Sequence, residues 1–332
     1  MAADKVRLAS VGLGWWGAML AEAVKRSGEG EIVSCFARGA DARKAFAGKA
    51  GCPQAGSFEE ILKDPSIQGI VLATPHSTHV TMIEQAASAG KHVFVEKPLT
   101  LTVKDARRAI EACEKAGVTL LVGHHRRRLG ATRRIKEMVE KRELGMLHQL
   151  EANLSMFGGQ TPRPGWRSEP GESPAGSMTG LGVHMVDNLI YLAGPVKRLS
   201  AFSKRLLGKS QLDDVTSIIL EFESGPLGYI GTGYVLPKIC YTAAYGTEAS
   251  AWSDEDGAKL YFQKKGEDVR RELPNQAGDA LALELAEFAQ CIRGKAKPET
   301  DGHAGLQVVA VLEAVIESAR TGRAVDVAAL RK

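Results

Sequence analysis

Short apolar runs alternate with helical patterns in the first third of the chain. The runs are VRLASV (6–11), EIVSCFA (31–37), GIVLAT (69–74), HVFVE (92–96) and VTLLVG (118–123). After Thr102, for example, apolar residues recur at helical spacing from Val103 to Cys113, until Gly117 ends the pattern. Short, continuously apolar strands separated by helices indicate a parallel sheet covered on both faces. Residues 1–124 are therefore predicted to form a doubly wound α/β domain.

The pattern changes in residues 125–332. A helical stretch at about 131–142 precedes four strand-like segments: HQLEANLSMF (148–157), VTSIILEFE (215–223), LGYIGTGYV (227–235) and KLYFQ (259–263). The turn sequences ESGPLG (223–228) and DEDG (254–257) join some of these segments, which favours an antiparallel sheet. Two helices are predicted after the strands, at 279–293 and 303–320. Residues 125–332 are thus predicted to form a second, α+β domain.

A segment rich in glycine and proline, GGQTPRPGWRSEPGESPAGS (158–177), lies inside the second domain. It can be an ordinary long surface loop or a lid over a site. Loops of this length in compact domains are more often functional than idle. We therefore keep both interpretations.

Composition narrows the class of protein. The chain has 332 residues, 44% of them hydrophobic, and a net charge of +4 with both signs interspersed, which fits a globular protein of about two domains and does not favour nucleic acid. Its five scattered cysteines form neither a CxxC pair nor a metal-ligand spacing, so no metal is expected and a reducing cytosol suits them. No secretory signal or membrane-length apolar run is visible. We expect a cytoplasmic protein whose partner is a small molecule, with no membrane and no nucleic acid.

Three glycines follow the first predicted strand in VGLGWWG (11–17), as Gly12, Gly14 and Gly17. This GxGxxG opens a helical pattern through Ala18–Arg26. In such motifs the glycines permit a tight turn, close approach of a pyrophosphate and close helix packing, and the helix N-terminus attracts phosphates. The alternative is a glycine-rich turn without a ligand. The strand–turn–helix context favours dinucleotide binding.

The end of the second predicted strand bears on the choice of dinucleotide. NAD sites usually place an acidic residue there to bind the ribose hydroxyls, but CFARGADARK (35–44) ends its strand on Ala37 and Arg38. Arg38, with Arg43 or Lys44 behind it, would bind a 2′-phosphate. Alternatively these are ordinary surface charges, and Asp41 either caps a helix or reaches the ribose. The sequence favours NADP(H) and leaves NAD(H) possible.

Lys97 lies where the fourth predicted strand stops, in VEKPLT (95–100). Ligands of open α/β sheets bind beyond the carboxyl ends of the strands, so Lys97 shares that edge with the glycine loop and with TPHSTH (74–79). The residues expected to contact the cofactor are Gly12, Gly14, Trp15, Trp16, Gly17, Arg38, Arg43, Thr74, Pro75, His76, His79, Glu96 and Lys97.

The chain resembles the glucose–fructose oxidoreductase, inositol dehydrogenase and rhizopine-catabolism family over nearly its whole length. The resemblance rests on the motifs above and on WR (166–167), GLGVHMVD (180–187) and the closing ESARTGRAVDV (317–327). The resemblance implies a dinucleotide domain, a substrate domain with a large, mostly antiparallel open sheet, and hydride transfer to or from sugars, cyclitols and related diols. It implies Lys97 and His184 as catalytic residues, with Asp187 as a further polar member. It also suggests a homo-oligomer, a dimer or tetramer, assembled through the second domain's sheet.

The residues themselves are compatible with these roles. His184 and Asp187 are three apart and would share a face of a helix. A lysine can take a hydroxyl proton near neutral pH when burial or nearby positive charge favours its neutral form. The alternative for His184 is a helix histidine paired with Asp187. One departure is Gly180, since many relatives carry an aspartate four residues before the histidine.

A cluster of positive charge, HHRRR (124–128), follows the fifth predicted strand. Its arginines can be surface residues over the domain junction. Alternatively, Arg127 or Arg128, with Arg163 or Arg167, binds a substrate carboxylate beside Trp166 and His184. A cyclic diol acid or uronic acid would then fit better than a neutral polyol. We therefore predict an NADP-dependent dehydrogenase or reductase; the alternative is a catalytically silent dinucleotide-binding sensor with the same fold.

Overall fold

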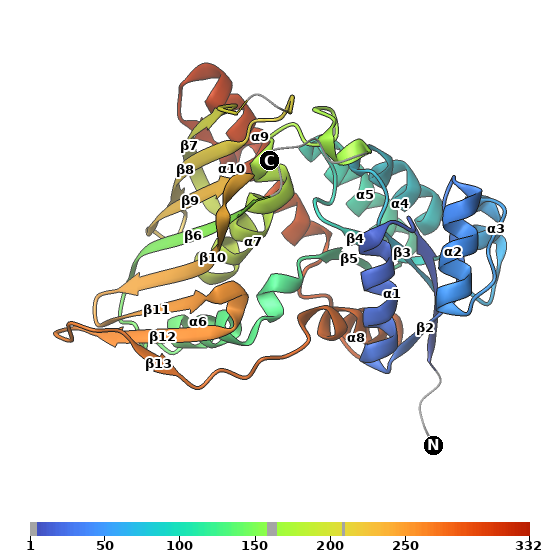
Figure 1. Ribbon diagram of the computed structural model, residues 1–332, viewed down its shortest axis with the longest axis horizontal. Coiled ribbons are helices and arrows are strands. Elements are labelled where there is room, and N and C mark those ends of the chain that lie inside the picture. Colours follow the sequence, from blue (N-terminus) through green and yellow to red (C-terminus); the bar gives the residue numbers. More distant parts are fainter. Residues whose placement is uncertain (1–4, 158–164, 208–209) are drawn as a thin grey trace. The chain divides into compact units, whose positions relative to one another are not determined.

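The computed structural model describes residues 5–157, 165–207 and 210–332, and its chain forms two compact units (Figure 1). The first unit comprises Met1–His125 and Asp279–Leu306, and the second comprises Arg126–Gly278 and Gln307–Lys332. None of the helices in the described ranges is both long and apolar enough to cross a membrane.

A five-stranded sheet forms the centre of the first unit. Its strands are β1 (Val6–Val11), β2 (Gly30–Phe36), β3 (Gly69–Leu72), β4 (His92–Glu96) and β5 (Leu120–Gly123). The helices of this unit are α1 (Trp15–Ser27), α2 (Ala40–Ala50), α3 (Phe58–Lys63), η1 (His76–Thr78), α4 (His79–Ser88), α5 (Val103–Ala116) and α8 (Ala280–Ile292). All neighbouring strands run parallel, in the order β2-β1-β3-β4-β5, so the predicted parallel sheet is confirmed.

The chain adds β2 on one side of β1 and then adds β3 on the other side, so the order of the strands changes direction at β1. β1 pairs with β2 on one side and with β3 on the other, and the chain continues from β3 to β4 and β5. Such a switch point opens a crevice at the carboxyl ends of the two strands, where α/β sheets bind ligands. The glycine loop follows β1 at this point.

One helix of the first unit comes from far along the chain. The hydrophobic pattern predicts that all of residues 125–332 belong to the second domain, whereas α8 packs against α1 in the first unit. Leu285 and Phe288 of α8 are buried with Leu20 and Val24 of α1 in one apolar cluster. The segment returns because its apolar face matches that of α1.

The second unit contains a nine-stranded sheet. Its strands are β6 (Leu147–Phe157), β7 (Val196–Lys204), β8 (Val215–Phe222), β9 (Leu227–Gly233), β10 (Val235–Gly246), β11 (Ala249–Asp254), β12 (Lys259–Lys264), β13 (Arg271–Leu273) and β14 (Val325–Asp326). They lie in the order β13-β12-β11-β10-β6-β9-β8-β7-β14. β6 and β9 pair in parallel and the other neighbouring pairs are antiparallel, which confirms the predicted sheet type.

The helices of the second unit flank these strands in the sequence. They are η2 (His125–Arg128), α6 (Gly130–Glu140), η3 (Trp166–Ser168), the π-helical turn η4 (Met178–Gly182), α7 (Val183–Ala193), η5 (Glu255–Gly257), α9 (Gly302–Thr321) and α10 (Val327–Leu330). η2 begins at the last residue of the first unit, and α9 begins in the first unit and continues in the second. The predicted loop at 158–177 contains η3, and its residues 158–164 lie outside the described residues.

Several strands of this sheet were not predicted. The sequence pattern predicts one strand over 227–235, whereas β9 ends at Gly233 and β10 begins at Val235. The apolar pattern does not predict β10, because Pro237 and Lys238 interrupt it. The register of β10 with β6 also shifts between Val235 and Ile239. The strands β7, β11, β13 and β14 were also missed.

Candidate active site

Two of the three motif glycines are required by the fold itself. Gly12 has a φ of 93°, and a Cβ placed on it would lie 2.4 Å from the carbonyl oxygen of Ala73. A Cβ on Gly17 would lie 1.9 Å from the carbonyl oxygen of Gly12. These glycines let the start of α1 lie close to the loop that follows β3.

Gly14 has a different explanation. It is the N-cap of α1 with a φ of −72°, which other residues adopt easily. Apart from Gly14 and its two chain neighbours, no described residue has an atom within 4 Å of the position of its missing Cβ. No described side chain caps this helix end. The first N–H groups of α1 and the open space beside Gly14 therefore suit a ligand phosphate. The glycine loop fits a dinucleotide on this observation.

The end of β2 holds two arginines in different environments. Arg43 donates from Nη1 to the carbonyl oxygens of Ala37 (2.7 Å) and Arg38 (3.1 Å), and its guanidinium lies 5.9 Å from the centre of the Phe36 ring. Arg43 therefore supports the backbone of the loop after β2. Arg38 is exposed, as is Asp41 in the first turn of α2. Arg38 thus presents a guanidinium at the carboxyl edge of the sheet.

His79 differs from the prediction of a direct cofactor contact. Its ring is fully buried, with Nδ1 3.1 Å from the carbonyl oxygen of Pro98 and 3.2 Å from that of Leu99. Nε2 lies 3.2 Å from the carbonyl oxygen of Thr74. The histidine joins the loop after β3 to the turn after β4, so its role within the unit is support.

The neighbouring residues of this edge are partly accessible. Thr74, Pro75, His76 and Lys97 are half-buried, and the Thr78 hydroxyl donates to the carbonyl oxygen of Pro75 at 2.7 Å. Glu96 is buried over Gly123 of β5, and the Lys97–Pro98 peptide bond is cis. Trp15 is exposed and its ring centre lies 5.2 Å from that of Trp16. Lys97 thus stands at the carboxyl end of β4, on the same edge as the glycine loop.

Arg127 and Asp187 bind each other in the second unit. Arg127 Nε donates to both carboxylate oxygens at 3.0 and 2.8 Å, and Nη2 donates to Oδ1 at 2.7 Å. Both side chains are buried, at 8% and 1% exposure, and the Arg127 guanidinium also lies 5.2 Å from the centre of the Tyr191 ring. The carboxylate that balances Arg127 therefore comes from α7, which differs from the predicted substrate contact of Arg127 and from the predicted catalytic role of Asp187.

Arg126 has an acidic partner of its own. Its guanidinium pairs with Asp256 in the turn between β11 and β12, and Lys238 donates to the same carboxylate at 2.8 Å. Burial by itself would raise the pKa of Asp256, but the charges of Arg126 and Lys238 outweigh burial and hold this pKa well below its usual range. Arg128 is almost completely buried. The arginine cluster is thus mainly internal to the unit.

The remaining predicted residues of the second unit lie in η3 and α7. His184 is buried in the first turn of α7, one turn before Asp187, as the spacing predicted. Arg167 is exposed and lies 4.2 Å over the ring of Trp166. Arg163 lies outside the described residues. The predicted cofactor residues, including Lys97, therefore belong to the first unit. His184 and the predicted substrate residues that the structure describes belong to the second unit.

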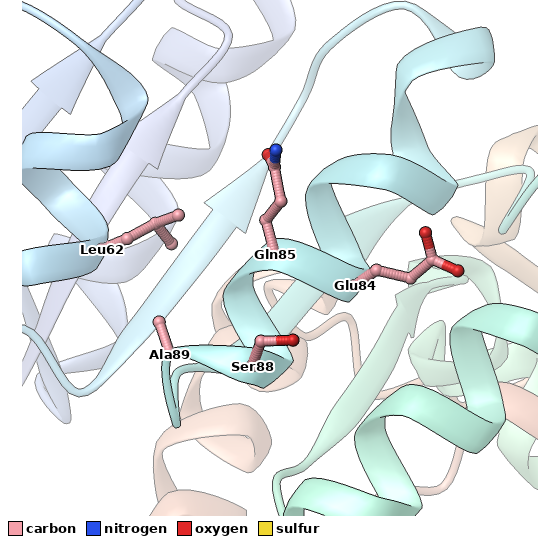
Figure 2. A pocket seen from close by; sticks show the side chains of 5 residues that line it. All are labelled: Leu62, Glu84, Gln85, Ser88 and Ala89. Atoms are coloured by element: carbon pink, nitrogen blue, oxygen red, sulfur yellow. The ribbon is translucent and has the colours of Figure 1, made fainter.

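A hollow between α3 and α4 is a separate feature of the first unit. Figure 2 shows its lining residues Leu62, Glu84, Gln85, Ser88 and Ala89. Ser88 ends α4 and Ala89 leads toward the start of β4, so the hollow lies at the amino edge of the sheet, opposite the glycine loop. It contains none of the predicted site residues.

Known proteins match both halves of the chain. The family described as "Oxidoreductase family, NAD-binding Rossmann fold" matches residues 6–124, and "Oxidoreductase family, C-terminal alpha/beta domain" matches residues 136–327. The chain is 27% identical over 318 residues to a 1,5-anhydro-D-fructose reductase of Ensifer adhaerens, covering 92% of this chain and 93% of the relative. It is 29% identical over 261 residues to an NAD(+) scyllo-inositol 2-dehydrogenase of Bacillus subtilis, covering 73% and 72%.

A solved structure is similar along the whole chain. The crystal structure of a proposed NADPH-dependent oxidoreductase from Desulfitobacterium hafniense is 32% identical, with a TM-score of 0.93 and 99% of each chain covered. The matches span both units. The chain therefore belongs to the glucose–fructose oxidoreductase, inositol dehydrogenase and rhizopine-catabolism family, and it is an NAD(P)-dependent oxidoreductase.

Proposed function

We propose that the protein transfers a hydride between NADP(H) and a secondary alcohol or carbonyl group of a sugar, cyclitol or cyclic diol. The observation that carries the proposal is the shared edge of the first sheet. There, Lys97 follows β4, and the open space at Gly14 lies at the uncapped start of α1. A phosphate-binding helix terminus and an acid–base side chain at one edge suit a dehydrogenase better than a passive binding module.

Each residue has a specific task in the proposed reaction. When bound, the dinucleotide would supply or accept the hydride through its nicotinamide ring. During oxidation Lys97 takes the proton of the substrate hydroxyl, and during reduction it returns a proton to the new hydroxyl oxygen. The family resemblance also implies a catalytic role for His184 of the second unit. The Arg127–Asp187 ion pair fixes η2 against α7, the helix that carries His184.

The proposed preference for NADP(H) rests on the end of β2. Arg38 is exposed there, and the strand end carries no carboxylate for the ribose hydroxyls. Relatives include both a proposed NADPH-dependent enzyme and an NAD(+) enzyme, so this local chemistry carries the preference. Asp41 is the group that would favour NAD(H).

Steady-state turnover tests the proposal directly. The protein should oxidise or reduce at least one member of a panel of sugars, cyclitols, dihydrodiols and uronic acids, with NADP(H) giving the higher kcat/KM. Tight dinucleotide binding without turnover on any member would favour the second candidate, a silent dinucleotide-binding sensor. Gly180 has no side chain at the position where the family resemblance implies an aspartate, and this departure supports the second candidate.

We also propose a cytoplasmic homo-oligomer that pairs through one face of the second sheet. Phe202, Ile219 and Leu227 are exposed at 75%, 60% and 54%. The pairings Phe202↔Ser217, Ile219↔Tyr229 and Glu221↔Leu227 place these side chains on one face. An apolar face of this kind on a described sheet fits a second copy of the chain.

A further inference from the structure

Tyr234 is the one residue between β9 and β10, and its position is well defined. Its backbone N–H donates to the carbonyl oxygen of Asp214 at 2.9 Å. Its half-buried phenol hydroxyl donates to the carbonyl oxygen of Gly176 at 3.3 Å. The break between the two strands therefore directs this hydroxyl toward the segment that leads into α7.

The hydroxyl occupies the place of a side chain on Gly180. A Cβ placed on Gly180 would lie 2.0 Å from the Tyr234 oxygen and 3.1 Å from the ring carbon that bears it. Gly180 is not among the glycines with positive φ, so its backbone conformation does not demand glycine. The phenol hydroxyl is the physical reason that residue 180 has no side chain.

The Tyr234 hydroxyl lies beside Gly180, on the same helix face as His184. Gly180 lies in the π-helical turn η4, which continues directly into α7, and His184 follows four residues later. Residues about one helical turn apart stack on the same face, and π-helical turns inside α-helices often mark functional sites. The Tyr234 hydroxyl therefore stands one turn before His184.

We propose that Tyr234 is a further substrate-binding residue, whose hydroxyl replaces the polar side chain that residue 180 lacks. A phenol that donates its single proton to Gly176 can still accept through its oxygen, so it would bind a hydroxyl group of the substrate. The proposal rests on the proposed function. Unlike a carboxylate, this acceptor is neutral, so it binds a polyol without repelling an acidic one.

Kinetics of Tyr234→Phe test the role in binding. The variant keeps the ring and loses only the acceptor, so KM for a polyol substrate should rise about tenfold while kcat changes less than threefold. The double variant Tyr234→Phe/Gly180→Ser should recover most of the lost KM, because it returns an oxygen to the vacated place. Tyr261→Phe on β12 is the matched control and should leave KM unchanged. An unchanged KM in Tyr234→Phe would overturn the proposal.

Thermal unfolding tests the contact independently of activity. Gly180→Ala should lower Tm by several degrees in the wild-type background, although alanine ordinarily favours a helix over glycine. In the Tyr234→Phe background the same change should lower Tm much less, since the atom 2.0 Å away is gone. Equal losses in both backgrounds would refute the contact. Absence of wild-type turnover on every substrate, with the Tm coupling present, would instead reject the proposed function and the substrate role with it.

Discussion

At the scale of single residues, Lys97 carries the proton transfer of the proposed reaction. We expect Lys97→Met to lower kcat by a factor of roughly 10²–10⁴, the range for loss of a general acid–base group. Cofactor affinity should change little, because in our proposal the glycine loop and Arg38 hold the dinucleotide. Methionine keeps most of the apolar stem, so the end of β4 should stay packed.

Measurement of kcat and of NADPH affinity on the same preparations checks this expectation. Lys104→Met, an exposed lysine of α5, is the control for removing one charge from the same unit. A Lys97→Met enzyme that turns over at the wild-type rate would leave His184 as the leading acid–base group.

Arg38 is the residue that discriminates between the two dinucleotides in our proposal. Arg38→Ala should weaken NADPH binding by about 1.5–3 kcal/mol, the usual value of a charge-assisted hydrogen bond, and should leave NADH binding nearly unchanged. Fluorescence titration of both cofactors measures the difference. Lys49→Ala, at the exposed end of α2, is the matched control. Equal affinities of the wild-type protein for NADPH and NADH would contradict the preference.

At the scale of elements, the Arg127–Asp187 pair joins η2 to α7. Both side chains are at most 8% exposed, so Asp187→Asn leaves a buried arginine without its counter-charge and should destabilise the fold by about 3–5 kcal/mol. Arg127→Met/Asp187→Leu should recover much of this loss, because neither charge of the pair remains. Denaturant unfolding of the three proteins checks the prediction. A double variant no more stable than Asp187→Asn would show that the unpaired charge is not the cause of the loss.

The turn between β11 and β12 makes stability depend on pH. The pKa of Asp256 is lower in the folded than in the unfolded chain, so its pairs with Arg126 and Lys238 stabilise the fold above the unfolded pKa, about 4. This contribution is lost as the pH falls toward the folded value. Asp256→Asn should therefore lower Tm at pH 7, and its gap to wild type should shrink below about pH 4.

Asparagine suits this test because it tolerates the φ of 63° at residue 256. Asp268→Asn, on the exposed turn after β12, is the control and should show no comparable gap at pH 7. A gap for Asp256→Asn that stays constant from pH 7 to pH 3 would show that the carboxylate's charge is not what stabilises the turn.

At the scale of the whole molecule, the proposed homo-oligomer depends on the exposed apolar face of the second sheet. Ile219 is 60% exposed on β8, opposite Tyr229 of β9, so Ile219→Lys places a charge in the middle of the apolar face. Light scattering after size-exclusion chromatography should show an oligomer for wild type and a smaller species for the variant. Val269→Lys, exposed in the turn after β12, should keep the wild-type mass. A monomeric wild-type protein would refute the assembly.

Local patterns determined much of this protein without reference to the rest of the chain. The helix α5 begins at Thr102, whose hydroxyl accepts the N–H of Asp105, and ends at Gly117 in the left-handed conformation, as periodicity and end signals indicated. The parallel sheet and the glycine loop were equally predictable. Strands buried on both faces and tight glycine turns depend on residues that are close in sequence, so their signals are local.

Tertiary structure decided what pairs with what. Apolar spacing shows that α8 buries one face, but not that the partner is α1, more than 250 residues earlier. The sequence shows three consecutive arginines at 126–128. It does not show that Arg127 pairs with Asp187 or that Arg126 pairs with Asp256. The sequence shows only that residue 180 has no side chain, whereas the structure places the Tyr234 hydroxyl where that side chain would lie. The periodicity of apolar residues predicts which side chains are buried. It does not predict which residues they contact, because those neighbours come together only in the folded chain.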